Sequence, residues 1–183
     1  QHMAFQTLLS YTNMGLNVFM RGPAGSGKTS AAYGLAKALG VQLYVMPLGP
    51  QTSKSDLIGY MNGAGDYVPS LLRKAYEHGG VLLLDEIDAA NPGVLTIING
   101  LLANGHSGFA DKMVDKHKDC YFVAAGNTYG RGADTMYVGR AQLDAATLDR
   151  WIILNWGYDW AFAAQLCGNQ DWTDYVRALH ERV

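Results

Sequence analysis

Short apolar runs alternate with segments of helical periodicity along this chain. The apolar runs predict five buried strands, at 17–20, 41–46, 81–84, 121–125 and 151–154. Apolar residues at helical spacing predict helices between the strands, over 28–39, 69–78, 91–104 and 144–150. This alternation is typical of a parallel sheet covered by helices on both faces, so the pattern predicts an α/β fold with three layers.

The segments outside this alternation are polar or short. Residues 49–68 are rich in Gly, Ser, Asp and Asn and predict a loop or hairpin. Residues 106–119 are polar and irregular. Beyond the last strand there is room for about two helices, near 160–166 and 172–182.

The length of the chain limits its domain organisation. A chain of 183 residues is long enough for one α/β core and too short for two ordinary domains. Residues 1–3 read as a cloning scar and are set aside. We therefore expect one main domain over 4–156, followed by C-terminal helices over 157–183.

The composition and charge of the chain limit which partners we expect it to bind and in which cellular compartment we expect it to work. Only 16% of residues are charged, against 49% that are hydrophobic, and such a charge-poor surface favours protein neighbours. The net charge of -2 and the pI near 6.2 give no basic field that would attract nucleic acid or anionic lipid non-specifically. The two cysteines lack metal-ligand or disulfide spacing, and no apolar run is long enough to cross a membrane. We expect a cytoplasmic protein that does not bind membranes.

The glycine-rich segment after the first strand carries the first chemical motif. Residues 22–29 match the Walker A pattern G-x-x-x-x-G-K-[ST] and lie between a predicted strand and a predicted helix, as the motif requires. Backbone N–H groups of such a loop surround phosphate oxygens, while Lys28 would contact the β and γ phosphates of ATP and Thr29 would bind Mg²⁺. The alternative is a chance glycine turn. The expected nucleotide contacts are Gly22, Pro23, Ala24, Gly25, Ser26, Gly27, Lys28, Thr29 and Ser30.

Polar residues end two further predicted strands. Asp85 and Glu86 follow the run at 81–84, a Walker B pattern in which Asp85 would hold the Mg²⁺ shell and Glu86 would orient and deprotonate the attacking water. Asn127 ends the next strand and could hydrogen-bond the water or the γ-phosphate. The alternatives are acids that only solubilise a strand end and an asparagine in a turn. Asp88 is interpreted as a local turn or cap residue.

Together these motifs resemble the AAA+ ATPases, and the resemblance covers residues 17–154. Three segments are similar to the MoxR, CobS and dynein-related subgroup: 56–60 (Asp-Leu-Ile-Gly-Tyr), 81–88 and 143–150. The resemblance implies a P-loop NTPase sandwich with five parallel strands in the order 5-1-4-3-2. It also implies a ring, commonly a hexamer, with ATP between subunits.

The resemblance assigns further roles. Arg150 occupies the position of an arginine finger that acts in trans on a neighbour's γ-phosphate, with Arg140 as second candidate and Arg131 as a weaker one. The alternative is a solvated surface arginine. By the same resemblance, residues 59–68 look like the helix-2 insert of the family, and residues 106–119 look like the hairpin before the strand that ends at Asn127. Both usually face the ring pore, where they could touch a partner; the alternative is that they are solvated loops.

The chain departs from the family after its last strand. Complete members continue into a helical lid with a second arginine sensor, whereas only residues 157–183 remain here, so the lid is partial or absent. The tryptophans are interpreted as packing residues rather than a base-stacking platform. The leading function is an ATP-hydrolysing motor that remodels a protein partner. The alternatives are an ATP-dependent assembly switch with negligible hydrolysis, a small-molecule kinase and a nucleic-acid motor.

Overall fold

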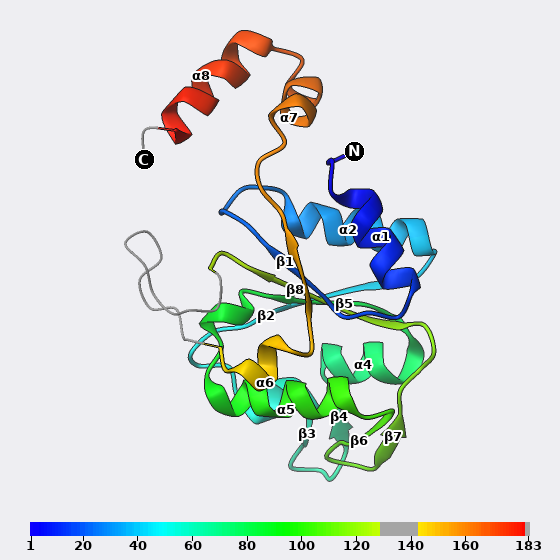
Figure 1. Ribbon diagram of the computed structural model, residues 1–183. Coiled ribbons are helices and arrows are strands. Elements are labelled where there is room, and N and C mark those ends of the chain that lie inside the picture. Colours follow the sequence, from blue (N-terminus) through cyan, green and yellow to red (C-terminus); the bar gives the residue numbers. More distant parts are fainter. Residues whose placement is uncertain (129–142, 182–183) are drawn as a thin grey trace.

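A five-stranded parallel sheet forms the centre of the molecule, as seen in a computed structural model that describes residues 1–128 and 143–181 (Figure 1). The strands are β1 (Val18–Arg21), β2 (Leu43–Pro47), β5 (Gly80–Asp85), β8 (Cys120–Gly126) and β9 (Ile152–Asn155). They lie in the order β2-β5-β8-β1-β9, and each neighbouring pair is parallel. Numbered one to five along the chain and read from the β9 edge, this is the predicted order 5-1-4-3-2.

Helices cover both faces of the sheet, which confirms the three-layer sandwich (Figure 1). One face carries α1 (Phe5–Asn13) and α2 (Lys28–Leu39), and the other carries α4 (Leu71–His78) and α5 (Pro92–Ala103). Successive side chains of a strand point to opposite faces of the sheet, so each strand contributes to both hydrophobic cores. Leu82 and Leu84 of β5 pack with the α4 and α5 side, while Val81 and Leu83 pack with the α1 and α2 side.

The predicted helix ends agree with the observed caps. Gly40 ends α2 in the left-handed region, with φ of 69°, a conformation that glycine adopts without steric cost. Asn91 caps α5 by accepting a hydrogen bond from the backbone N–H of Val94 at 3.0 Å, and Pro92 occupies the first turn. The short helix predicted at 144–150 is α6 (Ala145–Leu148), capped by Asp144.

Among the described residues, two α-helices were not predicted from the sequence. The first is α1, and the second is α3 (Lys54–Ile58), within the segment predicted as a loop or hairpin. A capping box starts α3: the Ser53 hydroxyl accepts a hydrogen bond from the Asp56 backbone N–H, and the Asp56 carboxylate accepts from the Ser53 backbone N–H. The hydrogen bonds that the Ser53 backbone N–H and hydroxyl donate to the Asp56 carboxylate lower its pKa. The prediction of a loop over residues 54–58 is therefore wrong, although a hairpin does follow.

Two small hairpins and two terminal helices complete the described chain. The first hairpin pairs β3 (Tyr60–Met61) with β4 (Tyr67–Val68), and the second pairs β6 (His106–Gly108) with β7 (Met113–Asp115). After β9, α7 (Trp160–Cys167) and α8 (Gln170–His180) pack against each other beyond the carboxyl end of the strands (Figure 1). No helix in the described ranges is both long and apolar enough to span a membrane.

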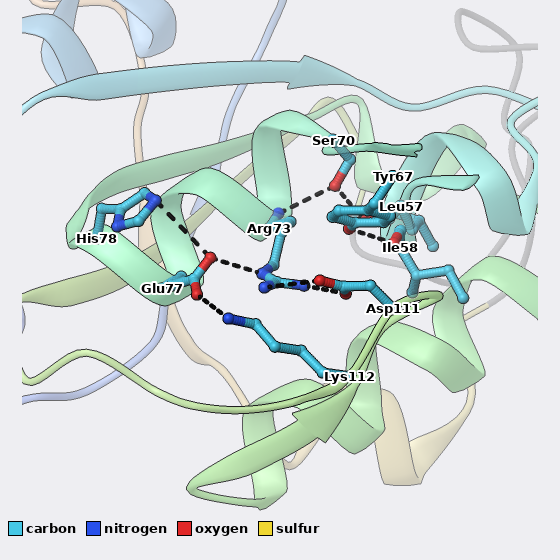
Figure 2. Close-up of polar contacts among 9 residues, drawn as sticks. All are labelled: Leu57, Ile58, Tyr67, Ser70, Arg73, Glu77, His78, Asp111 and Lys112. Atoms are coloured by element: carbon cyan, nitrogen blue, oxygen red, sulfur yellow. Dashed lines mark hydrogen bonds and ion pairs between the residues drawn. The ribbon is translucent and has the colours of Figure 1, made fainter. Parts of the chain in front are cut away.

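A buried arginine of α4 ties this helix to both hairpin regions (Figure 2). The Arg73 side chain is 3% exposed; its Nε donates to Glu77 at 3.0 Å and its Nη1 to Asp111 at 2.7 Å. The guanidinium carbon lies 5.2 Å from the ring centre of Tyr67 and 4.7 Å from that of Phe109. Arg73 therefore joins α4 to β4 and to the loop between β6 and β7.

We expect Arg73→Met to lower the free energy of unfolding by about 2 kcal/mol, because buried hydrogen bonds to charged groups are lost while the aliphatic volume is kept. Hydrogen bonds from Arg73 lower the pKa of Asp111 below its usual range, so this contribution is present at neutral pH and fades as pH falls below about 4. Urea unfolding at several pH values measures the difference. The exposed pair Arg177–Glu181 supplies the control: Arg177→Met should change stability by less than about 0.5 kcal/mol. If Arg73→Met and Arg177→Met lowered the free energy of unfolding equally, the stabilising role given to the buried Arg73 would be wrong.

Candidate nucleotide-binding site

The glycine-rich loop between β1 and α2 has a backbone that only glycine fits at three positions. Gly25 and Gly27 have φ of 77° and 84°, in the left-handed region, and Gly27 precedes the first turn of α2. At Gly22 a β-carbon would lie 1.7 Å from the backbone oxygen of Trp156. The free N–H groups of a helix N-terminus favour an anion, so the loop has the shape and dipole of a phosphate cradle.

Lys28 lies inside this loop and reaches the end of a second strand. Its Nζ donates to the backbone oxygens of Gly22 at 2.7 Å and Pro23 at 2.8 Å, and to the Asn127 Oδ1 at 3.0 Å. Asn127 directly follows β8. The structure thus brings together Lys28 and Asn127, which lie 99 residues apart in sequence.

The first turn of α2 meets the end of β5 at two oxygens. The Thr29 hydroxyl donates to the Asp85 Oδ2 at 3.3 Å, and the other Asp85 oxygen accepts from the backbone N–H of Glu86 at 3.1 Å. A hydroxyl and a carboxylate are hard oxygen donors of the type that Mg²⁺ takes from proteins, so these residues fit the ion. Glu86 has φ of 57° and is the one non-glycine residue with positive φ among those the structure describes. Such backbone outliers cluster at functional sites.

Asp88 has a different place from the one expected. It lies in the short 3₁₀ helix η1 (Ile87–Ala89), directly after the two acids, and is fully buried. Its Oδ2 accepts hydrogen bonds from the backbone N–H groups of Asn127 at 3.1 Å and Thr128 at 2.9 Å, and from the Thr128 hydroxyl at 2.8 Å. The interpretation of Asp88 as only a local turn or cap residue is therefore wrong. An acid within the apolar stretch Ile87 to Ala90 was the signal that a buried partner existed.

Arg150 lies with α5 and α6 rather than with the phosphate loop. Its Nε donates to the backbone oxygen of Asn99 at 3.2 Å, and its Nη1 donates to the backbone oxygen of Ala146. The structure therefore does not bring Arg150 to Lys28 or Asp85 within one chain. The other two candidates, Arg131 and Arg140, lie outside the described residues.

The segment after β9 packs against the outer side of the loop, a contact that sequence reasoning missed. Trp156 is buried and its Nε1 donates to the Ser26 backbone oxygen at 3.1 Å; the Tyr158 hydroxyl donates to the Ala24 backbone oxygen at 2.8 Å. His2, within the segment set aside as a scar, stacks on Trp156 with ring centres 4.1 Å apart. Trp156 is thus a packing residue, as expected, but one that also holds the loop.

A cavity of about 480 Å³ opens between this segment and the loop. Its walls come from the N-terminal residues, from Gly25 to Gly27, from the start of α2, from Trp156 and Tyr158, and from α7 and α8. The size is in the range of sites that bind nucleotide-sized molecules. Aromatic walls beside a phosphate loop would suit a nucleoside base.

A parallel sheet in this order, a glycine loop that opens α2 and acids at the end of β5 define a P-loop nucleoside triphosphatase domain. Comparison with known families agrees and is more specific. The family described as AAA domain (dynein-related subfamily) matches residues 17–151. The chain belongs to this family and is an AAA-family ATPase domain.

Curated relatives support the same subgroup. An uncharacterized Bacillus subtilis protein, YojN, is 30% identical over 158 residues, covering 79% of this chain and 49% of the relative. The aerobic cobaltochelatase subunit CobS of a Sinorhizobium species is 29% identical over 148 residues, covering 75% of this chain and 45% of the relative. The chain thus spans about half the length of these curated relatives.

Solved structures share the fold. A Cytophaga hutchinsonii protein described as a candidate ATPase superposes with a TM-score of 0.64 at 19% identity, covering 81% of this chain and 44% of that one. NtrX from Brucella abortus superposes with a TM-score of 0.66 at 16% identity, covering 82% of this chain and 35% of that one. At these identities the likeness establishes the fold alone.

Proposed function

We propose that this domain binds Mg·ATP and hydrolyses it at a site shared between neighbouring subunits of a ring. The observation that carries the proposal is the convergence of three elements on the phosphate loop. Lys28 of α2 contacts Asn127 after β8, and Thr29 of the same helix contacts Asp85 at the end of β5. This is the set of groups that phosphoryl transfer to water requires on one side of the nucleotide.

Each residue has a distinct role in the proposed reaction. Lys28 holds the β and γ phosphates, and Thr29 and Asp85 hold the Mg²⁺, which when bound neutralises phosphate charge. Glu86 orients a water and accepts its proton as the water attacks the γ-phosphate. The Asn127 amide, which can both donate and accept, positions that water or the phosphate. Residues 22–30 supply the backbone cradle.

The cavity beside the loop is the proposed place of the adenosine. Its walls include Trp156 and Tyr158, which already bond the loop backbone, so a base bound there would also order the segment between β9 and α7. We propose that residues 4–156 form the ATPase core and that α7 and α8 act as a partial lid over this cavity. Binding energy from the base would then depend on both parts.

We propose a protein rather than a nucleic acid as the partner that the motor remodels. The overall charge of -2 supplies no basic field for nucleic acid. Both hairpins carry exposed apolar side chains, with Tyr60 51% and Met113 61% exposed, and exposed apolar groups suit a polypeptide. The relative CobS is named as a subunit of a cobaltochelatase, so that relative works within a protein assembly.

Arg150 is the proposed trans-acting arginine, and mixing two inactive variants tests this role. Arg150→Ala keeps its own phosphate loop, whereas Lys28→Ala keeps its arginine. In a random equal mixture about a quarter of the head-to-tail interfaces would join the two intact halves, so ATP hydrolysis should rise well above that of either variant alone. Phosphate release, measured across protein concentrations that span assembly, gives the readout.

A second mixture controls for assembly itself. Lys28→Ala and Glu86→Gln both damage the loop side of the interface, so their mixture contains no intact site and should stay inactive. If crosslinking shows mixed rings of Arg150→Ala and Lys28→Ala but no activity returns, Arg150 is not the finger. Hydrolysis by the wild type that is independent of assembly would count against a shared site.

A further inference from the structure

We propose that Asp88 is a positioning residue, which sets the position of Asn127 beside Lys28 and is needed for the rate of ATP hydrolysis more than for nucleotide binding. The inference rests on the proposed ATPase function. It concerns the end of β8, where Asn127 and Thr128 leave the sheet. Neither the motifs nor the comparisons assign Asp88 a role.

The contacts of Asp88 act on the backbone that carries Asn127. One carboxylate oxygen accepts from the N–H of Asn127 at 3.1 Å, from the N–H of Thr128 at 2.9 Å and from the Thr128 hydroxyl at 2.8 Å. Hydrogen bonds to an ionised acceptor are about twice as strong as neutral ones, and burial strengthens them further. These bonds fix two successive residues at the end of β8 and so direct the Asn127 side chain.

The path from Asp88 to the phosphate loop is short. The Asn127 Oδ1 accepts from Lys28 Nζ at 3.0 Å, and the Gly126 oxygen accepts from the backbone N–H of Gly22 at 3.1 Å. Asp88 belongs to η1, which follows the catalytic candidate Glu86 directly. One buried carboxylate therefore links the segment after β5, which carries Glu86, to the segment after β8, which carries Asn127.

The packing at this junction leaves little room for another arrangement. At Gly126 a β-carbon would lie 3.2 Å from the carboxyl carbon of Asp88 and 2.9 Å from the Phe19 ring. The end of β8 thus lies directly against Asp88, with no side chain between them. Removing the carboxylate would leave the N–H groups of Asn127 and Thr128 without this acceptor in a buried place, and they would shift to find another.

We expect Asp88→Ala to lower kcat for ATP about 10- to 10²-fold, because a displacement of about 1 Å is enough for such a loss, with less than about threefold change in the Kd for ATP. Asp88→Asn keeps an oxygen acceptor and should retain more of the rate than Asp88→Ala. The exposed acid Asp171 on α8 supplies a control, and Asp171→Ala should leave both constants unchanged.

A double-mutant cycle separates positioning from a general loss of stability. If Asp88 acts through Asn127, then adding Asp88→Ala to Asn127→Ala should lower kcat little further. If the two single losses of kcat multiplied fully in the double mutant, the proposal would be overturned. A loss of ATP affinity in Asp88→Ala that parallels its loss of kcat would also overturn it. Thr128→Val removes one of the three donors and provides a milder variant if Asp88→Ala does not fold; it should lower kcat with ATP affinity kept.

Hydrogen exchange distinguishes failure of this inference from failure of the proposed function. Exchange at the amides of Asn127 and Thr128 can be measured without any hydrolysis, and Asp88→Asn should speed it selectively relative to the rest of β8. Unchanged protection at both amides would contradict the positioning role even in an active enzyme. If Asp88→Asn speeds exchange at these amides but the wild-type protein never hydrolyses ATP, the contact of Asp88 with the end of β8 is established and the proposed reaction is wrong.

Discussion

Replacing Glu86 with glutamine is expected to lower the rate of ATP hydrolysis by about 10² or more while Mg·ATP remains bound. The amide has nearly the shape of the carboxylate but cannot accept the proton of the attacking water. Lys28, Thr29 and Asp85, which carry the proposed phosphate and metal contacts, are unchanged in the variant. Binding and chemistry should therefore separate, with the affinity kept and the turnover lost.

Single-turnover phosphate release and equilibrium ATP binding measure the two quantities for Glu86→Gln. Glu181→Gln makes the same chemical change at an exposed residue after α8 and should leave turnover at the wild-type level. Turnover by Glu86→Gln close to that of the wild type would place the base elsewhere. The bound but inactive state would also trap the remodelled partner, which co-purification could then identify.

Replacing Lys28 with alanine is expected to weaken ATP binding about 10²-fold, because charge-assisted contacts to two phosphates are lost. The fold should persist, since α2 is held through its apolar face: Ala32 and Leu35 are fully buried against the sheet. Fluorescence of a labelled ATP analogue measures the affinity, and circular dichroism checks the fold.

Lys37, which is exposed in the last turn of the same helix, provides the matched control for Lys28→Ala. Lys37→Ala removes the same kind of charge and should leave the affinity for ATP unchanged. If Lys28→Ala bound ATP as tightly as the wild type and had a native circular dichroism spectrum, the assignment of the phosphate loop would be wrong. The same loss in both lysine variants would indicate a general effect of charge instead.

The sheet and its covering helices were predictable because their signals are local. Apolar runs such as 81–84 can be buried only between two helical layers, and caps such as Asn91 and Gly40 mark where the helices begin or end. The missed helices lack such strong patterns. The first, α1, mixes its few buried residues with polar ones, and α3 is a single short turn that depends on its capping box.

The candidate site was predictable where its residues follow one another in a motif. Lys28 and Thr29 are fixed by the glycine pattern, and Asp85 and Glu86 by the end of an apolar strand. Asp88 and Trp156 could not be placed in this way, because their partners at the end of β8 and in the phosphate loop are distant in sequence. Such contacts depend on strand order and loop path, which motifs do not encode.

Equilibrium titration of the wild-type protein with ATP, in the presence and absence of Mg²⁺, shows whether the glycine-rich loop and the end of β5 form a site for Mg·ATP. The arrangement of Lys28, Thr29 and Asp85 predicts saturable binding at one site per chain, strengthened by Mg²⁺ and competed by ADP. A calorimeter reports both the stoichiometry and the affinity. Absence of saturable binding by the folded protein, or binding that Mg²⁺ and Lys28→Ala leave unchanged, would show that these residues do not form an ATP site.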